Sequence, residues 1–238
     1  FKKRKMNIFT NTMVKKIEKN TSNVKVHLES GKTIEADKAL IAVGVQGNIE
    51  NLGLGDCSIT VEEGWIKVNE YMETSLSNVY AIGDVAGPPW LAHVASAEGI
   101  TAVEHLAGLN PDPMKYDNIP GCTYCHPEVA SVGLTEKAAK EKGYEVKIGN
   151  FPFRGLGKSM AVGDTDGFVK VVYDAKYGEM LGCHILGAEA TNLITEAVIA
   201  RNLETTHHEV LKTIHPHPTL SEAIMEATAD ALEEAIHI

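Results

Sequence analysis

The second half of the chain places four strand-like segments ahead of three helical ones. The strand-like segments are Glu128–Leu134, Tyr144–Phe153, Phe168–Tyr173 and Met180–Leu186, and a hairpin turn over Asp174–Gly178 joins the last two. The helical segments are Ala190–Asn202, Thr206–Thr213 and Thr219–Ala235. Strands that precede the helices, rather than alternate with them, predict an α+β domain in which helices cover an antiparallel sheet.

The first half has the mixed pattern of an α/β protein. Alternating apolar residues over Val24–Leu28 and the Ser30-Gly31 turn predict a β-hairpin that leads into a buried strand, Lys38–Val43, closed by Gly44. Further elements are expected as short strands at Trp65–Val68 and Asn78–Ile82 and as an alanine-rich helix at Leu91–Leu106. The glycine-rich stretch after Val43 and the loop near Met114–Tyr116 indicate domain boundaries.

Composition excludes several classes of protein. A chain of 238 residues is long enough for one large domain or two ordinary ones. The net charge of −10 argues against general nucleic-acid binding, which needs basic surface. No apolar run is long enough to span a membrane, and the start lacks the apolar region of a signal peptide. Because Phe1–Lys19 resembles the interior of a longer chain, we expect a fragment.

Asp84 and the helix after it form the first candidate site. A strand that ends at Gly83-Asp84 presents a carboxylate at the edge of a sheet where ligands bind, and such a carboxylate accepts hydrogen bonds from sugar or polyol hydroxyls. The N-terminus of the next helix offers free N–H groups and a positive dipole end to developing negative charge. The alternatives stay open: Asp84 as a turn cap, and the helix as an ordinary packed element.

Cys122 and Cys125 form a CxxC pair, which occurs in redox proteins and in zinc sites. A zinc site needs a second pair of ligands, but Cys57 and Cys183 stand alone in the sequence. The pair also precedes a strand rather than starting a helix. We therefore interpret both cysteines as half-buried structural residues and expect no metal. Four cysteines are too few for a disulfide scaffold, which favours a reducing compartment.

His215 and His217 flank a proline ahead of the last helix. Thr219 and Glu222 have the spacing of a capping box, with Thr219 as N-cap. In a second interpretation, His217 is a general base and Glu222 orients its ring. The two interpretations compete, because one carboxylate cannot fully serve the cap and the imidazole. His215 is interpreted as a turn residue.

Taken in order, six segments resemble the C-terminal half of a flavin-dependent pyridine nucleotide–disulphide oxidoreductase. They are Val79–Val85 (VYAIGDV), Leu91–Gly99 (LAHVASAEG), Ile119–Gly133, Gly163–Lys170, Leu181–Gly187 and His215–Glu226 (HPHPTLSEAIME). The resemblance covers nearly the whole chain. Leu220–Ala223 favours the branch that oxidises dihydrolipoamide, since glutathione reductases typically read HPTSSEE there.

The resemblance implies a role for each matching residue. Asp84 would bind the ribityl chain of FAD, Leu91, Ala92 and His93 would lie at the flavin's pyrimidine edge, and Gly44 would also contact cofactor. His217 would take the proton of a dihydrolipoamide thiol, with Glu222 orienting it and the His217–Pro218 bond cis. Electrons would pass through a disulfide of the other subunit of a homodimer, then through FAD, to NAD.

The resemblance also divides the chain into the end of an NAD domain (1–43), a central FAD-contacting domain (44–115) and an interface domain (116–238). The GxGxxG fingerprints and the family's CxxxxC pair are absent, so this chain alone would not complete a turnover. The expected partners are lipoyl-bearing subunits of 2-oxoacid dehydrogenase complexes, in the bacterial cytoplasm or the mitochondrial matrix. The alternatives are a glutathione-reductase-like enzyme and a stand-alone dimerisation module.

Overall fold

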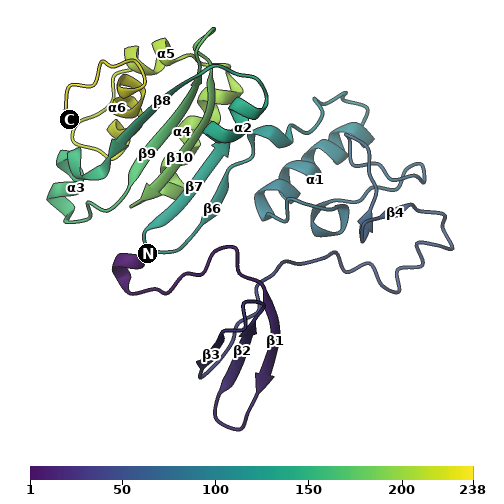
Figure 1. Ribbon diagram of the computed structural model, residues 1–238. Helices are drawn as coiled ribbons and strands as arrows, with labels where there is room; N and C mark the ends of the chain where they lie inside the picture. Colours follow the sequence, from purple (N-terminus) through teal and green to yellow (C-terminus); the bar gives the residue numbers. More distant parts are fainter. Residues whose placement is uncertain (238) are drawn as a thin grey trace. The chain divides into compact units, whose positions relative to one another are not determined.

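The computed structural model describes residues 1–237, which form two compact units. The first is Phe1–Asn48, and the second begins at Ile49 (Figure 1). Each unit is described separately below. Across the described residues, no helix combines the length and the apolar character that crossing a bilayer requires.

The first unit is built around a small antiparallel sheet. Its elements are η1 (Lys2–Arg4), β1 (Val14–Lys19), β2 (Val24–Leu28) and β3 (Thr33–Ala36), and the sheet order is β1-β2-β3. The β2–β3 hairpin turns at Gly31, which adopts φ +83° and donates its N–H to the Leu28 carbonyl at 3.0 Å. The predicted hairpin is therefore confirmed.

The prediction of a buried strand over Lys38–Val43 is wrong. The segment has no regular secondary structure, and Leu40 and Val43 are each 93% exposed. A strand needs a neighbouring strand to pair with its backbone N–H and C=O groups, and no strand in residues 1–237 pairs with the segment Lys38–Val43. An apolar run alone did not reveal this lack of a partner.

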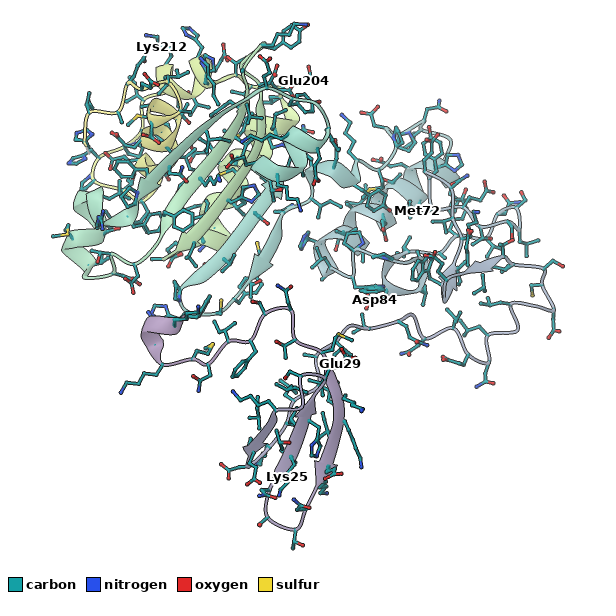
Figure 2. The ribbon with its side chains drawn as sticks, viewed as in Figure 1. Lys25, Glu29, Met72, Asp84, Glu204 and Lys212 are labelled. Atoms are coloured by element: carbon teal, nitrogen blue, oxygen red, sulfur yellow. The ribbon has the colours of Figure 1, made fainter. Side chains whose placement is uncertain are left out.

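The second unit begins with short elements around one long helix. They are β4 (Val61–Glu62), β5 (Trp65–Ile66), η2 (Gly83–Ala86), α1 (Ala92–Leu106) and η3 (Tyr116–Asn118). The expected helix is confirmed by α1, and only the first half of the expected strand at Trp65–Val68 forms. Met72, labelled in Figure 2, is 1% exposed and belongs to the core of this part.

The expected strand at Asn78–Ile82 is also wrong. Only an isolated bridge between Glu73 and Tyr80 forms there. Asn78 adopts φ +62°, and Val79 uses its backbone groups in local turn bonds with Thr74 and Leu76. The segment is thus held by turns rather than by a neighbouring strand.

A five-stranded antiparallel sheet dominates the rest of the chain (Figure 1). Its strands are β6 (Gly121–Thr123), β7 (Glu128–Gly133), β8 (Val146–Pro152), β9 (Phe168–Asp174) and β10 (Met180–Gly187). The sheet order is β6-β7-β10-β9-β8. All four strand-like segments of the second half are confirmed, as is the predicted class of antiparallel sheet with helices.

Helices cover both faces of this sheet. Helices α4 (Ala190–Asn202) and α6 (Glu222–Asp230) lie on one face and α2 (Glu136–Glu141) lies on the other, while η4 (Phe153–Gly155), α3 (Gly157–Val162) and α5 (His207–Lys212) are further helical elements of this part. The main core joins one sheet face to α4 and α6 through Val169, Val171, Tyr173, Ile185, Ile194, Ala197, Ile224 and Ala227. Alternate residues such as Val172 and Leu181 face α2 instead, as the period of two along a strand requires.

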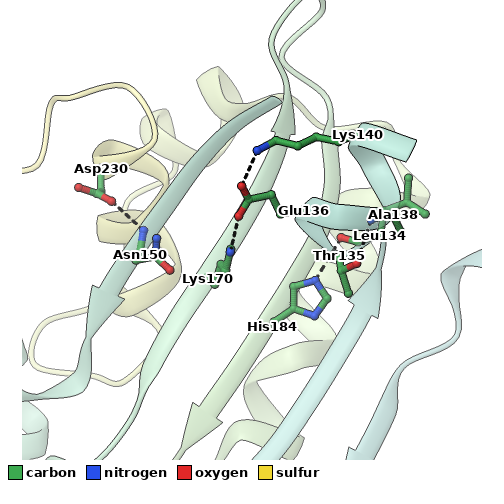
Figure 3. A network of polar contacts seen from close by, with 9 residues as sticks. All are labelled: Leu134, Thr135, Glu136, Ala138, Lys140, Asn150, Lys170, His184 and Asp230. Atoms are coloured by element: carbon green, nitrogen blue, oxygen red, sulfur yellow. Dashed lines mark hydrogen bonds and ion pairs between the residues drawn. The ribbon is translucent and has the colours of Figure 1, made fainter. Parts of the chain in front are cut away.

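Polar contacts fix α2 and α6 to the sheet (Figure 3). On one face, Glu136 of α2 forms ion pairs with Lys170 of β9 at 2.7 Å and with Lys140 at 2.6 Å. These two cations lower the pKa of Glu136 to about 2. Asp230, the last residue of α6, accepts a hydrogen bond from the Asn150 N–H of β8 at 2.7 Å.

The segment after residue 115 is bonded to both α1 and α4. Tyr116 donates its hydroxyl to Glu98 of α1 at 2.8 Å, and Asn118 donates to the Val198 carbonyl of α4 at 3.0 Å. Arg201 of α4 returns a bond to the Asp117 carbonyl at 3.0 Å. Residues from Ile49 onward thus form one compact unit, and the predicted boundary near residue 115 stays a prediction.

Candidate active site

His217 lies in the loop between α5 and α6. Its side chain is 74% exposed, and the peptide bond to Pro218 is cis, as the family resemblance implied. The loop ends where α6 begins, so the first turn of α6 lies directly after the imidazole. This places Glu222, the first residue of α6, five positions beyond His217.

His217 and Glu222 form a hydrogen-bonded pair. The ring Nδ1 of His217 is 2.8 Å from Oε1 of Glu222. Since an ionised carboxylate only accepts hydrogen bonds, Nδ1 carries the proton and donates. The Nε2 of a neutral ring then keeps its lone pair, and in residues 1–237 no group is hydrogen-bonded to it. This is the arrangement of a general base whose tautomer is fixed by a carboxylate.

Glu222 serves the helix end and the imidazole at the same time. While Oε1 accepts from His217, Oε2 accepts from the Thr219 N–H at 2.7 Å. The prediction that the two interactions exclude each other is therefore wrong, because the carboxylate has two oxygens. The predicted N-cap position of Thr219 is also wrong, because α6 begins at Glu222 with Ser221 as its N-cap. Of the predicted capping box only the bond from the Thr219 N–H to Glu222 forms, and the Thr219 hydroxyl donates to the Pro216 carbonyl at 2.8 Å.

The environment of Glu222 keeps it ionised. Burial raises its pKa, but the bonds from the Thr219 N–H and from His217 outweigh burial, so the pKa lies below its ordinary value of 4.5. The carboxylate is thus charged at neutral pH and remains an acceptor for the imidazole.

A second histidine–carboxylate pair, missed from the sequence, borders the same site. His217 and Glu222 line a cavity of about 70 Å³ together with Phe151, Gly155, Leu156, Gly157, Glu226 and His237. Glu226 is 3% exposed and accepts from His237 Nδ1 at 2.5 Å. Its spacing of four from Glu222 on one helix was the available signal.

Asp84 lies in η2 and is exposed (Figure 2). The residue before it, Gly83, donates its N–H to Glu98 of α1 at 2.7 Å. Gly83 adopts φ +70°, and a Cβ added to it would lie 3.3 Å from the Cβ of Ala95. Asp84 is therefore held close to the first turns of α1.

The start of α1 carries Leu91, Ala92 and His93. Leu91 donates its N–H to the Pro89 carbonyl at 3.0 Å, whereas the N–H groups of Ala92 and His93 find no acceptor within residues 1–237. The His93 ring is engaged with the Pro120 carbonyl at 3.1 Å. The N-terminal end of α1 thus offers two free backbone N–H groups near the exposed carboxylate of Asp84.

Gly44 lies in the first unit, adopts φ +133° and has open space around its Cα. The structure gives no contact that assigns it a binding role, so its contact with cofactor stays a prediction.

The cysteines of the CxxC pair have free thiols, and both are half-buried. Burial, together with the charge of Glu128, raises the pKa of Cys122, which disfavours a nucleophilic thiolate. Within the part of the chain that the structure describes, no group of three His, Cys, Asp or Glu side chains is arranged to hold a metal ion.

Comparison with protein families assigns both halves of the chain. Residues 119–228 match the dimerisation domain of the pyridine nucleotide-disulphide oxidoreductases, and residues 1–99 match the profile named pyridine nucleotide-disulphide oxidoreductase. The chain belongs to the pyridine nucleotide–disulphide oxidoreductase family. The family resemblance predicted from the sequence is thereby confirmed.

Curated members of this oxidoreductase family are closely similar. The chain is 50% identical to the dihydrolipoyl dehydrogenase of Rhizobium etli, covering 96% of this chain and 49% of that protein. It is 47% identical to the dihydrolipoyl dehydrogenase of Zymomonas mobilis, covering 100% of this chain and 52% of the relative. The chain therefore spans about half the length of these relatives.

Solved structures of oxidoreductases share the fold. A crystal structure of LpdA from Mycobacterium tuberculosis superposes with a TM-score of 0.87 at 26% identity, covering 96% of this chain and 50% of that one. The Cu(II) complex of RclA, an HOCl-induced flavoprotein disulfide reductase from Escherichia coli, gives 0.85 at 25% identity, covering 92% and 50%.

Proposed function

We propose that the chain is the C-terminal part of a dihydrolipoyl dehydrogenase in which His217 is the base and Glu222 its orienting partner. The observation that carries the proposal is the 2.8 Å bond from His217 Nδ1 to Glu222. The curated relatives named dihydrolipoyl dehydrogenase, at 47% and 50% identity, support the choice of substrate. The structural neighbours titled LpdA and disulfide reductase stand at only 26% and 25% identity, respectively.

The pair is suited to deprotonating a thiol. A free thiol has a pKa of about 8.5 and is mostly protonated at neutral pH, whereas imidazole, with a pKa of about 6.5, accepts a proton there. His217 takes the thiol proton of dihydrolipoamide on Nε2, and the imidazolium that forms is stabilised by the charge of Glu222. The thiolate then attacks a protein disulfide through a mixed-disulfide intermediate.

The disulfide belongs to the proposed partner subunit. All four cysteines of this chain are free thiols, so the disulfide that the thiolate attacks comes from outside the described residues. The match of residues 119–228 to a dimerisation domain supports a homodimer that brings the disulfide to His217. Because the imidazole is 74% exposed in the single chain, such an approach is sterically open.

Asp84 and the start of α1 fit a flavin. An exposed carboxylate accepts hydrogen bonds from the polyol hydroxyls of FAD, and the free N–H groups of Ala92 and His93 suit its electron-rich pyrimidine edge. When bound, FAD supplies the two-electron chemistry between the disulfide and NAD. Glu98 has the supporting role, since it holds Gly83 and thereby Asp84 against α1.

The proposed physiological partners are the lipoyl-bearing subunits of 2-oxoacid dehydrogenase complexes. The curated relatives are bacterial proteins, which favours the bacterial cytoplasm over the mitochondrial matrix.

The test uses the flavoprotein expressed from the whole reading frame. We expect His217→Gln to lower the steady-state rate of dihydrolipoamide oxidation by about 10²- to 10⁴-fold while the flavin absorbance stays unchanged. His208→Gln, which alters an exposed histidine of α5, is the matched control and should keep its rate. A near-normal rate for His217→Gln would overturn the assignment.

A further inference from the structure

The second histidine of the loop, His215, is buried although His217 is exposed. The His215 side chain is 5% exposed, against 74% for His217. The interpretation of His215 as a turn residue is therefore incomplete. A polar ring buried to this extent needs hydrogen-bond partners, and those partners reveal its role.

Both ring nitrogens of His215 face groups that can only accept. Nε2 is 2.9 Å from Oε1 of Glu196 on α4, and Nδ1 is 3.1 Å from the backbone carbonyl of Thr213. A neutral imidazole has a single N–H and satisfies one of these acceptors, whereas an imidazolium satisfies both. The geometry therefore selects the protonated ring.

The charges around His215 agree with this. The bond to Glu196 raises the pKa of His215 more than burial lowers it, and the charges of Glu196 and Glu222 act in the same direction. The ring borders a cavity of about 230 Å³ to which Met180, Ala197, Val210 and Ile224 contribute apolar walls. Glu209 of α5 also lines it, but its carboxylate is engaged by the Thr206 N–H at 3.0 Å. No lysine or arginine is among the described residues of the lining.

The His215 bonds fasten one side of the loop, and Glu222 fastens the other. His215 attaches the loop to α4, while the Thr219 N–H attaches it to Glu222 of α6. His217 lies midway between the two attachments. These two attachments restrict where the chain between them, and with it the ring of His217, can lie.

We propose that protonated His215 is a positioning residue that clamps the loop to Glu196 and so presents His217 to Glu222. This inference rests on the proposed function of His217. When His215 loses its proton, one of its two bonds is lost and the clamp weakens. The clamp is thus present below the folded-state pKa of His215 and lost as pH rises through it.

A first test, independent of activity, uses NMR of the 238-residue chain with labelled histidines. We expect His215 to titrate above 6.5 in the parent chain and at a lower pH in Glu196→Gln, which keeps an acceptor oxygen but removes the charge. We also expect His215→Gln to shift the Nδ1 signal of His217, and His208→Gln to leave it in place. An unchanged His217 signal in His215→Gln would overturn the proposal.

A second test compares kcat of the parent flavoprotein with kcat of Glu196→Gln across pH. The quantity compared is the ratio of the parent kcat to the variant kcat at each pH. It should stay near one at acidic pH, where His215 is protonated in both proteins, and rise to about 10-fold between the two His215 pKa values, because misplacing a catalytic group is costly. A purely structural role for Glu196 would give a ratio that does not vary with pH, which contradicts the clamp.

The two proposals fail separately. If His217→Gln keeps its activity, the proposed function fails. If His217→Gln is inactive but the ratio for Glu196→Gln is independent of pH, only the clamp fails.

Discussion

At the scale of single residues, the site depends on which side chain is buried. His215 and His217 stand two positions apart, and nothing in the sequence separates them except resemblance to a family. The structure distinguishes them by burial, since the His215 ring is buried between two acceptors and the His217 ring is exposed to solvent. The contact between Glu222 and His217 was predictable from the sequence, but the simultaneous use of both Glu222 oxygens depends on three-dimensional geometry.

Glu222 should make stability depend on pH. Its folded-state pKa is lowered, so its contribution is present above the unfolded value near 4.5 and is lost as pH falls through the folded value. We expect Glu222→Gln to destabilise the chain at pH 7 in urea unfolding and to lose this difference near pH 3. An equal difference at both pH values would contradict the ionised pair.

Glu98 should matter for stability because it is 3% exposed and holds two donors. Glu98→Ala removes the acceptor of the Gly83 N–H and of the Tyr116 hydroxyl, and we expect a loss of about 1–3 kcal/mol in the free energy of unfolding. Glu104→Ala on the same helix is the control and should change stability little. Similar losses in both variants would mean that only helix content was affected.

At the scale of elements, the pattern of apolar residues predicted the five-stranded sheet's main strands and the long helices, but the spacing of Thr219 and Glu222 did not predict how α6 begins. The spacing T-x-x-E stands ahead of two helices of the second half, at Thr206–Glu209 and at Thr219–Glu222. The first closes as a full capping box on α5, while at the second only the bond from the Thr219 N–H to Glu222 forms, since α6 begins at Glu222 with Ser221 as N-cap. The segments Lys38–Val43 and Asn78–Ile82 failed as strands since strand formation needs a partner, which local pattern does not reveal.

The packing of α6 on β8 depends on Gly149. A Cβ at this position would lie 1.7 Å from the Ala227 carbonyl oxygen of α6, so the helix would have to move. We expect Gly149→Ala to cost at least about 1 kcal/mol in the free energy of unfolding, and to disturb the His217–Glu222 bond that α6 carries. Gly55→Ala, which places its Cβ in open space, is the control. Equal melting temperatures for the two variants would contradict this packing.

At the scale of the whole molecule, the chain leaves apolar side chains exposed beside the loop that carries His217. Ile199, Leu203 and Ile214 are 56%, 69% and 94% exposed. Large exposed apolar side chains that gather on one surface are typical of an interface, and residues 119–228 match a dimerisation domain.

We therefore expect the chain to sediment as a dimer, at twice its mass of 25.7 kDa, at micromolar concentration. The dimer should weaken when Leu203 and Ile214 are both replaced by aspartate, because burying the new charges is costly. A monomer at all concentrations would count against the shared active site.

The proton-accepting role of His217 is tested most directly by measuring the two half-reactions of the full-length flavoprotein separately. Flavin reduction is followed by stopped-flow absorbance after mixing with dihydrolipoamide, and in a second experiment after mixing with NADH. We predict that His217→Gln slows the dihydrolipoamide half-reaction by about 10²-fold or more and leaves the NADH half-reaction unchanged, since only the thiol needs a base. The role of His217 would be contradicted if His217→Gln reacted with dihydrolipoamide as fast as the parent protein does. It would also be contradicted if the substitution slowed both half-reactions equally.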